Sequence, residues 1–195
     1  MGRPGRVKIL GAVARALERV SSAVGNGAAW LALVMVVVGA FNALSRYLGR
    51  FTGSDLSSNA YIELQWYLFS ALFLLGAADA LREDAHVRVD VVYGRLGPRA
   101  GAVVDLIGTL VFLLPFCAFA LWTSLPMVEN SWRVMEQSPD PGGLPRYPIK
   151  TLIPVGLLLV MLQGIAVCCR RIRVLSGEQD ENPNMADGRT RPEGR

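Results

Sequence analysis

The sequence predicts an all-α integral membrane protein with four transmembrane helices and two further amphipathic helices at the membrane surface. Three observations support this fold class: long uncharged runs, a low overall charge and an uneven distribution of basic residues. Of the 195 residues, 52% are hydrophobic and 18% are charged, whereas a soluble domain usually carries about 25% charge. The charges lie between four uncharged runs, at residues 20–45, 64–78, 106–128 and 151–169.

These runs give the boundaries of the expected spans. A transmembrane helix needs roughly 20 mostly apolar residues, and the second run reaches that length when Glu63 and Asp79 sit at its two ends. The expected spans are residues 25–47, 60–81, 101–128 and 150–170. The expected domains are an N-terminal cytoplasmic segment (1–24), a membrane domain (25–172) and a cytoplasmic tail (173–195), which is polar, low in aromatic residues and expected to be disordered.

The basic residues predict the orientation of the chain, because Lys and Arg are enriched in cytoplasmic segments beside spans. Fifteen of the 20 Lys and Arg residues lie in the two tails and in the loop between the second and third spans, and five lie in the other two loops. Both termini and the second loop are therefore expected in the cytoplasm.

The N-terminal segment is expected to form a basic amphipathic helix. Apolar side chains recur there at helical spacing, at Ile9, Val13, Leu17, Val20 and Val24. Basic side chains gather elsewhere on the same helix, at Lys8, Arg15 and Arg19. Such a helix suits an inner leaflet whose anionic lipids would be its partners. We expect it to bend near residues 25–27 and to continue into the first span.

Acidic and aromatic residues open the second span. Glu63, Trp66 and Tyr67 share one helix face by their spacing, and we expect that face to contact a partner helix. The span closes with small residues around Asp79, which permit close helix approach. The candidate interface residues of this span are Glu63, Gln65, Trp66, Tyr67 and Asp79.

A polar cluster at residues 82–90 follows the second span and contains the chain's only histidine. We expect His86, Arg88 and Asp90 to hold a short interfacial helix against the second span, the lipid surface or a partner subunit. A metal site is disfavoured, because the chain has one histidine and no Cys-x-x-Cys pair.

Other chemistry is disfavoured as well. Glu63, Asp79 and Asp105 could carry protons or ions, but each lies within a turn or two of a span's end, where it reaches water or loop arginines. No Ser, Thr or Cys makes a credible nucleophile–base pair with the single histidine. We therefore expect no enzymatic activity.

The third span and the loop after it are rich in proline. Pro115 lies at mid-span and should kink the helix. The loop at residues 131–150 holds four prolines and two glycines, so we expect it to present an ordered outer surface to a partner. Its candidate residues are Trp132, Glu136, Ser138, Gly143, Leu144, Pro145 and Lys150.

Together these motifs resemble the small, Q-type (DctQ-like) permease subunit of a tripartite ATP-independent periplasmic (TRAP) transporter. The resemblance covers roughly residues 25–172. The motifs that carry it are Glu63-Leu64-Gln65-Trp66, Asp84-Ala85-His86-Val87-Arg88-Val89-Asp90, Trp132, Glu136-Gln137-Ser138, Gly143-Leu144-Pro145 and Pro148-Ile149-Lys150.

The resemblance implies a fixed, non-catalytic scaffold in the bacterial inner membrane. Its implied partners are a large multispan permease subunit and a periplasmic binding protein that delivers an organic acid, typically a carboxylate. Sodium and substrate sites are implied in the large subunit, so no cofactor is expected in this chain.

Two other functions remain open. One is a self-sufficient small four-helix transporter, although such proteins rely on an acid deep in the first span, and residues 20–45 contain none. The other is an adaptor subunit of a different membrane complex.

Overall fold

The computed structural model describes residues 4–52, 58–83 and 97–177, and all elements and contacts below refer to these ranges. Its elements are α1 (Pro4–Thr52), α2 (Asn59–Arg82), α4 (Pro98–Ile107), the π-helix η1 (Gly108–Leu113), α5 (Leu114–Arg133) and α6 (Tyr147–Leu175). No strand occurs within the described ranges.

Four helical stretches are long and apolar enough to cross a membrane, which confirms the predicted all-α fold with four transmembrane helices. They are Ile9–Phe51, Asn59–Arg82, Arg99–Arg133 and Tyr147–Leu175. Each of the expected spans lies within one of these stretches. The third stretch joins α4, η1 and α5 into one helical path.

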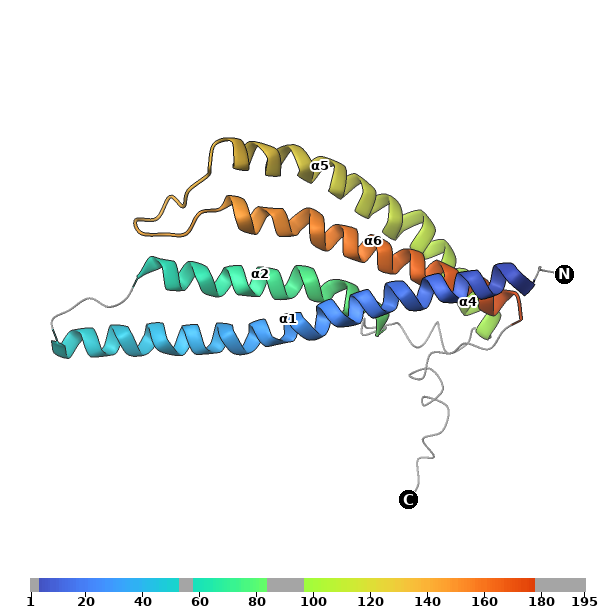
Figure 1. Ribbon diagram of the computed structural model, residues 1–195, viewed down its shortest axis with the longest axis horizontal. Coiled ribbons are helices and arrows are strands. Elements are labelled where there is room, and N and C mark those ends of the chain that lie inside the picture. The colour runs from blue at the N-terminus through green and yellow to red at the C-terminus, as the bar shows by residue number, and fades with distance from the viewer. Residues whose placement is uncertain (1–3, 53–57, 84–96, 178–195) are drawn as a thin grey trace, which may run out of the picture.

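The helices lie side by side in the order α1, α2, α6 and α5 (Figure 1). Close contacts explain this order. On α1, a Cβ added to Gly39 would meet the Gln65 amide of α2 at 3.0 Å, and on α6 a Cβ added to Gly156 would meet the carbonyl oxygen of Leu74 at 2.8 Å. Because Gln65 and Leu74 are nine residues apart, they lie on opposite sides of α2. α2 therefore separates α1 from α6 between Gln65 and Leu74.

The N-terminal segment continues into the first span, as expected, since residues Pro4–Thr52 form one helix. Small residues recur every seven positions on it, and Ala14, Ser21 and Ala28 are buried. Ala14 packs against Ala166 and Cys169 of α6. This packing face fixes α1 to α6 at the end of the layer that holds the N-terminus. A lipid contact by the remaining faces stays a prediction.

A π-helix lies directly before the mid-span proline of the third span. Pro115 has no backbone N–H to donate, and just before it the N–H of Leu114 donates to the carbonyl of Thr109, five residues back. The ladder of hydrogen bonds is thus offset by one residue over Gly108–Leu113. Thr109 is buried within this turn.

Part of the sequence-based interpretation lies outside the described residues. This holds for His86, Arg88 and Asp90, for the interfacial helix expected around them, and for residues 178–195 of the tail.

Candidate functional site

Polar side chains gather at the two ends of the helix layer. The outer cluster lies where α2 begins and where the loop at residues 134–146 joins α5 to α6. The inner cluster lies where α2 ends and where α1, α4 and α6 meet. These clusters contain most of the described residues that the sequence singled out.

Glu63 is the centre of the outer cluster. It lies in the first turns of α2 and only 2% of its surface is exposed. Its carboxylate accepts hydrogen bonds from the hydroxyl of Ser138 and from the backbone N–H of Leu144. Both donors belong to the loop between α5 and α6. A single carboxylate therefore holds that loop against the start of α2.

Gly143 lets the loop approach this carboxylate. A Cβ at position 143 would lie 2.5 Å from the side chain of Ser138 and 2.7 Å from Oε2 of Glu63. Two further hydrogen bonds join the same loop to α2. Asn59 Nδ2 donates to the carbonyl of Pro141 at 3.0 Å, and the Tyr67 hydroxyl lies 3.1 Å from the carbonyl of Pro145.

Glu136 closes the loop on itself. Its carboxylate accepts from the Ser131 hydroxyl at 2.7 Å and from Nζ of Lys150. Lys150 and then Ser131 hold the pKa of Glu136 below its ordinary value, because both stabilise the carboxylate form. The backbone N–H of Arg146 also donates to the carbonyl of Glu136 at 2.8 Å. The two ends of the loop are thus joined across its base.

Aromatic rings surround the outer cluster. Trp132 donates from Nε1 to the Thr151 hydroxyl at 2.8 Å, and its ring centroid lies 4.5 Å from that of Tyr147. The Arg146 guanidinium lies 5.9 Å from the ring centroid of Trp66. Trp66 and Trp132 remain 41% and 46% exposed. A partner or lipid can therefore reach both rings.

The face expected at the start of α2 divides between two environments. Glu63 and Tyr67 bond to the chain's own loop, whereas Trp66 points outward. Gln65 lies on the α1 side of the helix, against Gly39.

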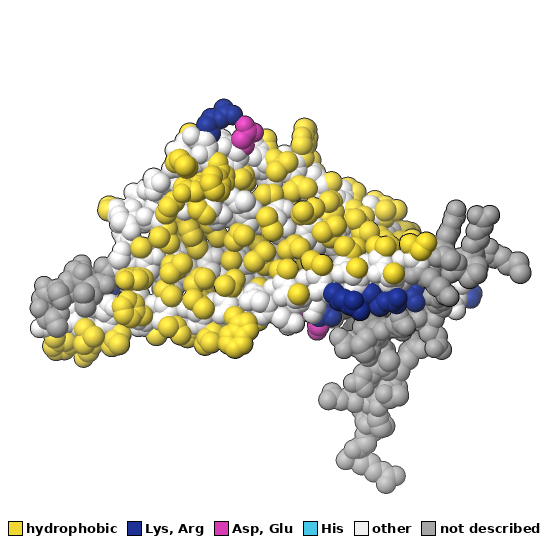
Figure 2. Space-filling model, in the orientation of Figure 1, with side chains coloured by type: hydrophobic (Ala, Val, Ile, Leu, Met, Phe, Trp, Pro, Cys, Tyr) yellow, Lys and Arg dark blue, Asp and Glu magenta, His cyan; other side chains and the backbone are white. Residues whose placement is uncertain are grey.

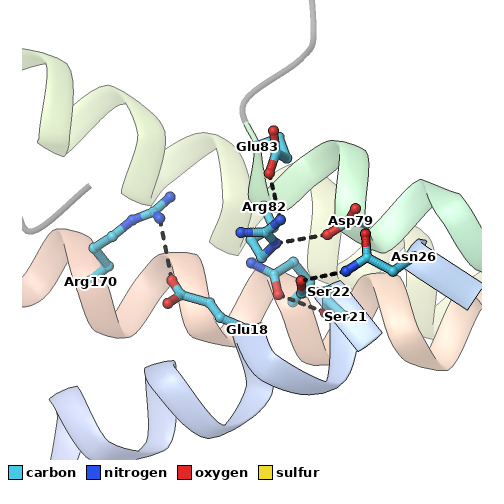
Figure 3. A network of polar contacts seen from close by, with 9 residues as sticks. Glu18, Ser21, Ser22, Asn26, Asp79, Arg82, Glu83 and Arg170 are labelled. Atoms are coloured by element: carbon cyan, nitrogen blue, oxygen red, sulfur yellow. Dashed lines mark hydrogen bonds and ion pairs between the residues drawn. The ribbon is translucent and has the colours of Figure 1, made fainter. Parts of the chain in front are cut away.

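The inner cluster joins α1, α2, α4 and α6, and Figure 3 shows its residues on α1, α2 and α6. Asp79 of α2 pairs with Arg82 at 2.7 Å. Asp79 also packs so closely on α1 that a Cβ at Gly25 would lie 2.5 Å from its side chain. The Ser21 hydroxyl of α1 donates to Oε1 of Gln163 at 2.8 Å, and Gln163 is completely buried in α6.

Two adjacent arginines of α6 bind acids on different helices. Arg170 lies 3.3 Å from the carboxylate of Glu18 on α1, and Arg171 lies 2.9 Å from that of Asp105 on α4. The side chains of Arg171 and Asp105 are only 5% and 14% exposed. Sequence reasoning counted these arginines toward orientation and missed their pairing. Gln163 could have indicated a buried polar contact between helices, since it is the one amide side chain of the uncharged run 151–169.

This arrangement binds helices and a loop together. Within the described ranges, no three His, Cys, Asp or Glu side chains lie close enough together to hold a metal ion. The acids of both clusters instead accept bonds from groups of the same chain.

Comparison with known proteins identifies a family whose model matches most of the chain. A family model described as "Tripartite ATP-independent periplasmic transporters, DctQ component" matches residues 13–174, which include both clusters. The curated "Isethionate TRAP transporter permease protein DctMQ" of Oleidesulfovibrio alaskensis is 27% identical over 143 residues, or 71% of this chain. The chain spans only 22% of the length of that relative. No solved structure matches the chain.

Proposed function

The chain belongs to the DctQ component family of tripartite ATP-independent periplasmic transporters, and from this premise we propose that it is the fixed scaffold subunit of such a transporter. At the level of the family it is a membrane subunit of a transporter and not an enzyme, and its four apolar helices make it a multi-pass inner-membrane protein.

The carboxylates support this role. An acid that carried an ion or a solute would need to exchange partners during transport. Here Glu63 binds the outer loop, Glu18 binds Arg170 and Asp105 binds Arg171, each across two elements of this chain. A chain whose acids are used to fix its own helices is better suited to support a carrier than to be one.

The partners and the solute follow from the family as part of the proposal. A large multispan permease subunit carries the solute and couples its uptake to sodium, and a periplasmic binding protein delivers an organic acid. The DctMQ relative is named for isethionate. This chain adds neither a substrate site nor a cofactor site of its own.

The outer cluster supports a contact with the binding protein. Four hydrogen bonds from the loop and from α2 hold residues 138–145 in place, so their surface meets a partner with little loss of conformational entropy. Both termini lie in the cytoplasm in this proposal, and the loop then faces the periplasm. The inner cluster lies at the cytoplasmic side.

Reconstitution tests the proposal. Proteoliposomes are made with the chain alone, with the large permease subunit alone and with both, and the binding protein is supplied outside with its radiolabelled solute. We expect sodium-dependent uptake only with both subunits. Solute uptake by this chain alone would show that it is a self-sufficient transporter, and full uptake by the large subunit alone would contradict a required scaffold.

A further inference from the structure

The carbonyl group of Leu110 has no hydrogen-bond donor in its own helix. In η1 each N–H donates to the carbonyl five residues back, as the N–H of Leu114 does to Thr109. The donor five residues after Leu110 would be residue 115, which is a proline and has no N–H. Leu114, four residues after Leu110, already donates to Thr109. The main-chain oxygen of Leu110 is therefore left without a backbone partner.

A second proline repeats this effect further along the same helix. Pro126 lies inside α5, so the carbonyl of Trp122, four residues before it, loses the donor that an α-helix normally supplies. Pro115 and Pro126 are eleven residues apart, which is close to three helical turns, and both are exposed. The two prolines therefore lie on one side of the helix.

The residues around both carbonyls are exposed. α5 lies at the edge of the helix layer, and α6 is its main neighbour (Figure 1). Leu114 faces α6, since a Cβ at Gly164 would lie 3.2 Å from its side chain, whereas Leu110 is 57% exposed and Trp122 is 72% exposed. Figure 2 shows apolar side chains along the edge that α5 forms, with charged ones at its outer end. This edge is thus open to whatever lies beside the chain in the membrane.

Lipid cannot satisfy the Leu110 carbonyl. Leu110 lies within the uncharged run 106–128 of the membrane-crossing stretch Arg99–Arg133. A main-chain group that faces hydrocarbon without a hydrogen-bond partner is costly, because acyl chains carry no donor. The edge therefore suits an apolar neighbour that supplies a donor at this depth.

A symmetric second copy of this chain does not supply that donor. A two-fold pair of parallel chains places the same residues at the same depth on both sides. Near Leu110 these are the apolar residues Val111, Pro115 and Ala118. Trp122 carries an indole N–H, but it lies 12 residues further along the helix, or about 18 Å away. The donor must come from a different membrane protein.

From these observations we propose that a transmembrane helix of the large permease subunit packs on the exposed face of η1 and α5 and donates a hydrogen bond to the Leu110 carbonyl. The face consists of Leu110, Val111, Pro115, Ala118, Trp122 and Pro126. Hydroxyl and amide side chains form such bonds between membrane helices, and a small residue such as Ala118 permits close approach. This inference rests on the proposed function and adds to it the face on which the two subunits meet.

Binding of the large subunit to Pro115→Ala tests the hydrogen bond. The full-length chain is titrated with purified large subunit in detergent, and the Kd is measured. Alanine returns an N–H five residues after Leu110, so the carbonyl is satisfied within the chain and the partner's donor contributes less. We expect binding to weaken by about three- to tenfold, as for one hydrogen bond between membrane helices. An unchanged Kd would overturn the inference.

Pro154→Ala is the matched control, because Pro154 also lies inside a span but belongs to α6. It should leave the Kd unchanged. An equal loss of affinity in both proline variants would show a general effect on helix shape and would overturn the inference.

Photo-crosslinking identifies the occupant of the face. p-Benzoylphenylalanine replaces Val111 in the full-length chain within native membranes, and we expect a crosslink to the large subunit. The control position is Val36 of α1, which is 63% exposed at the opposite edge of the layer. Crosslinks from Val111 to lipid alone or to a second copy of this chain would overturn the inference, as would an equal or higher yield of large-subunit crosslinks from Val36.

The parent chain separates this inference from the proposed function. If the parent chain co-purifies with the large subunit while Val111 crosslinks lipid alone, the docking face is wrong and the scaffold role stands. If the parent chain does not bind the large subunit at all, both are wrong.

Discussion

The outer and inner clusters hold neighbouring elements together by different means. At the outer end, Glu63 fixes a loop by accepting hydrogen bonds from a hydroxyl and a backbone N–H, and the loop needs Gly143 to approach it. At the inner end, charged side chains on one helix pair with charges on its neighbours, as Arg171 does with Asp105. The outer end thus shapes a surface, and the inner end sets how the helices lie beside one another.

This difference indicates why hydrogen bonds suit the outer end of a fixed subunit and ion pairs suit its inner end. A hydrogen-bonded loop keeps its surface at constant shape, which suits recognition by a soluble partner. A buried ion pair is costly to break on one side, because the remaining charge stays in a poorly solvated place. Changes at the inner end should therefore affect the stability of the whole chain, and changes at the outer end should affect the loop.

The largest effect is expected at the inner end. Arg171→Met leaves the carboxylate of Asp105 without the guanidinium 2.9 Å away, and we expect a loss of about 3 kcal/mol or more in the free energy of unfolding. Denaturant unfolding in detergent measures it. Adding Asp105→Leu should recover much of the loss, since both charges are then absent. A double variant as unstable as the sum of the two single ones would show that the pair is not coupled.

A smaller effect is expected where α2 and α6 touch. Gly156→Ala places a Cβ 2.8 Å from the carbonyl oxygen of Leu74 and should destabilise the chain by about 1–3 kcal/mol, because the two helices must separate. Gly76→Ala is the matched control, since a Cβ there meets nothing within 4 Å. It should be neutral or slightly stabilising. Equal loss of stability in both variants would rule out this contact as the cause.

The next effect is local to the outer loop. Glu63→Gln keeps one acceptor oxygen and replaces the other by an NH2 group, so the side chain can no longer accept from both the Ser138 hydroxyl and the Leu144 N–H. We expect several-fold faster hydrogen exchange over residues 138–144, while exchange in α1 is unchanged. Glu129→Gln removes an exposed pair with Arg133, in which both side chains are about 70% exposed, and should leave exchange unchanged. Unchanged exchange in the Glu63 variant would contradict the role given to that carboxylate.

The smallest effect is expected when the pH is lowered. Because Lys150 and Ser131 hold the pKa of Glu136 below its ordinary value of 4.5, its contribution to folding is present above about pH 5 and is lost as the pH falls through the lowered pKa. The difference in loop proteolysis between the parent chain and Glu136→Gln should therefore shrink as the pH falls below the ordinary pKa of a glutamate and through the lowered one. Equal proteolysis of the parent chain and Glu136→Gln at neutral pH would show that this carboxylate does not hold the loop.

The sequence predicted the four spans and singled out most residues of the outer cluster, whereas at the inner cluster it singled out Asp79 and Asp105 but not the helices that they contact, for a physical reason. Uncharged runs and turn residues are local signals, so Glu63, Glu136 and Gly143 stood out before their partners were known. The pairing of Arg170 with Glu18 joins residues 152 positions apart, and no spacing rule reaches that far. The π-helix was likewise hidden, because Pro115 predicts a disturbed helix without specifying its form.

The sequence also did not show that Glu63 is buried while Trp66 is exposed, and the reason is similar. Their spacing places them near one another on α2, but the loop that covers Glu63 and leaves Trp66 exposed comes more than 70 residues later. Helical periodicity shows which residues are neighbours on a helix, whereas tertiary contacts decide which of them remain accessible.

Uptake with the outer loop tied to α2 tests the scaffold claim most directly. Asn59 and Pro141 are joined by a 3.0 Å hydrogen bond, and Asn59→Cys with Pro141→Cys can be bridged by a short, reducible thiol crosslinker. The native cysteines, Cys117, Cys168 and Cys169, are buried, so the parent chain treated with the same reagent is the control. Uptake is then measured with the large subunit and the binding protein present. A fixed scaffold predicts the same rate with and without the bridge, and a rate that falls on bridging and returns on reduction would contradict it.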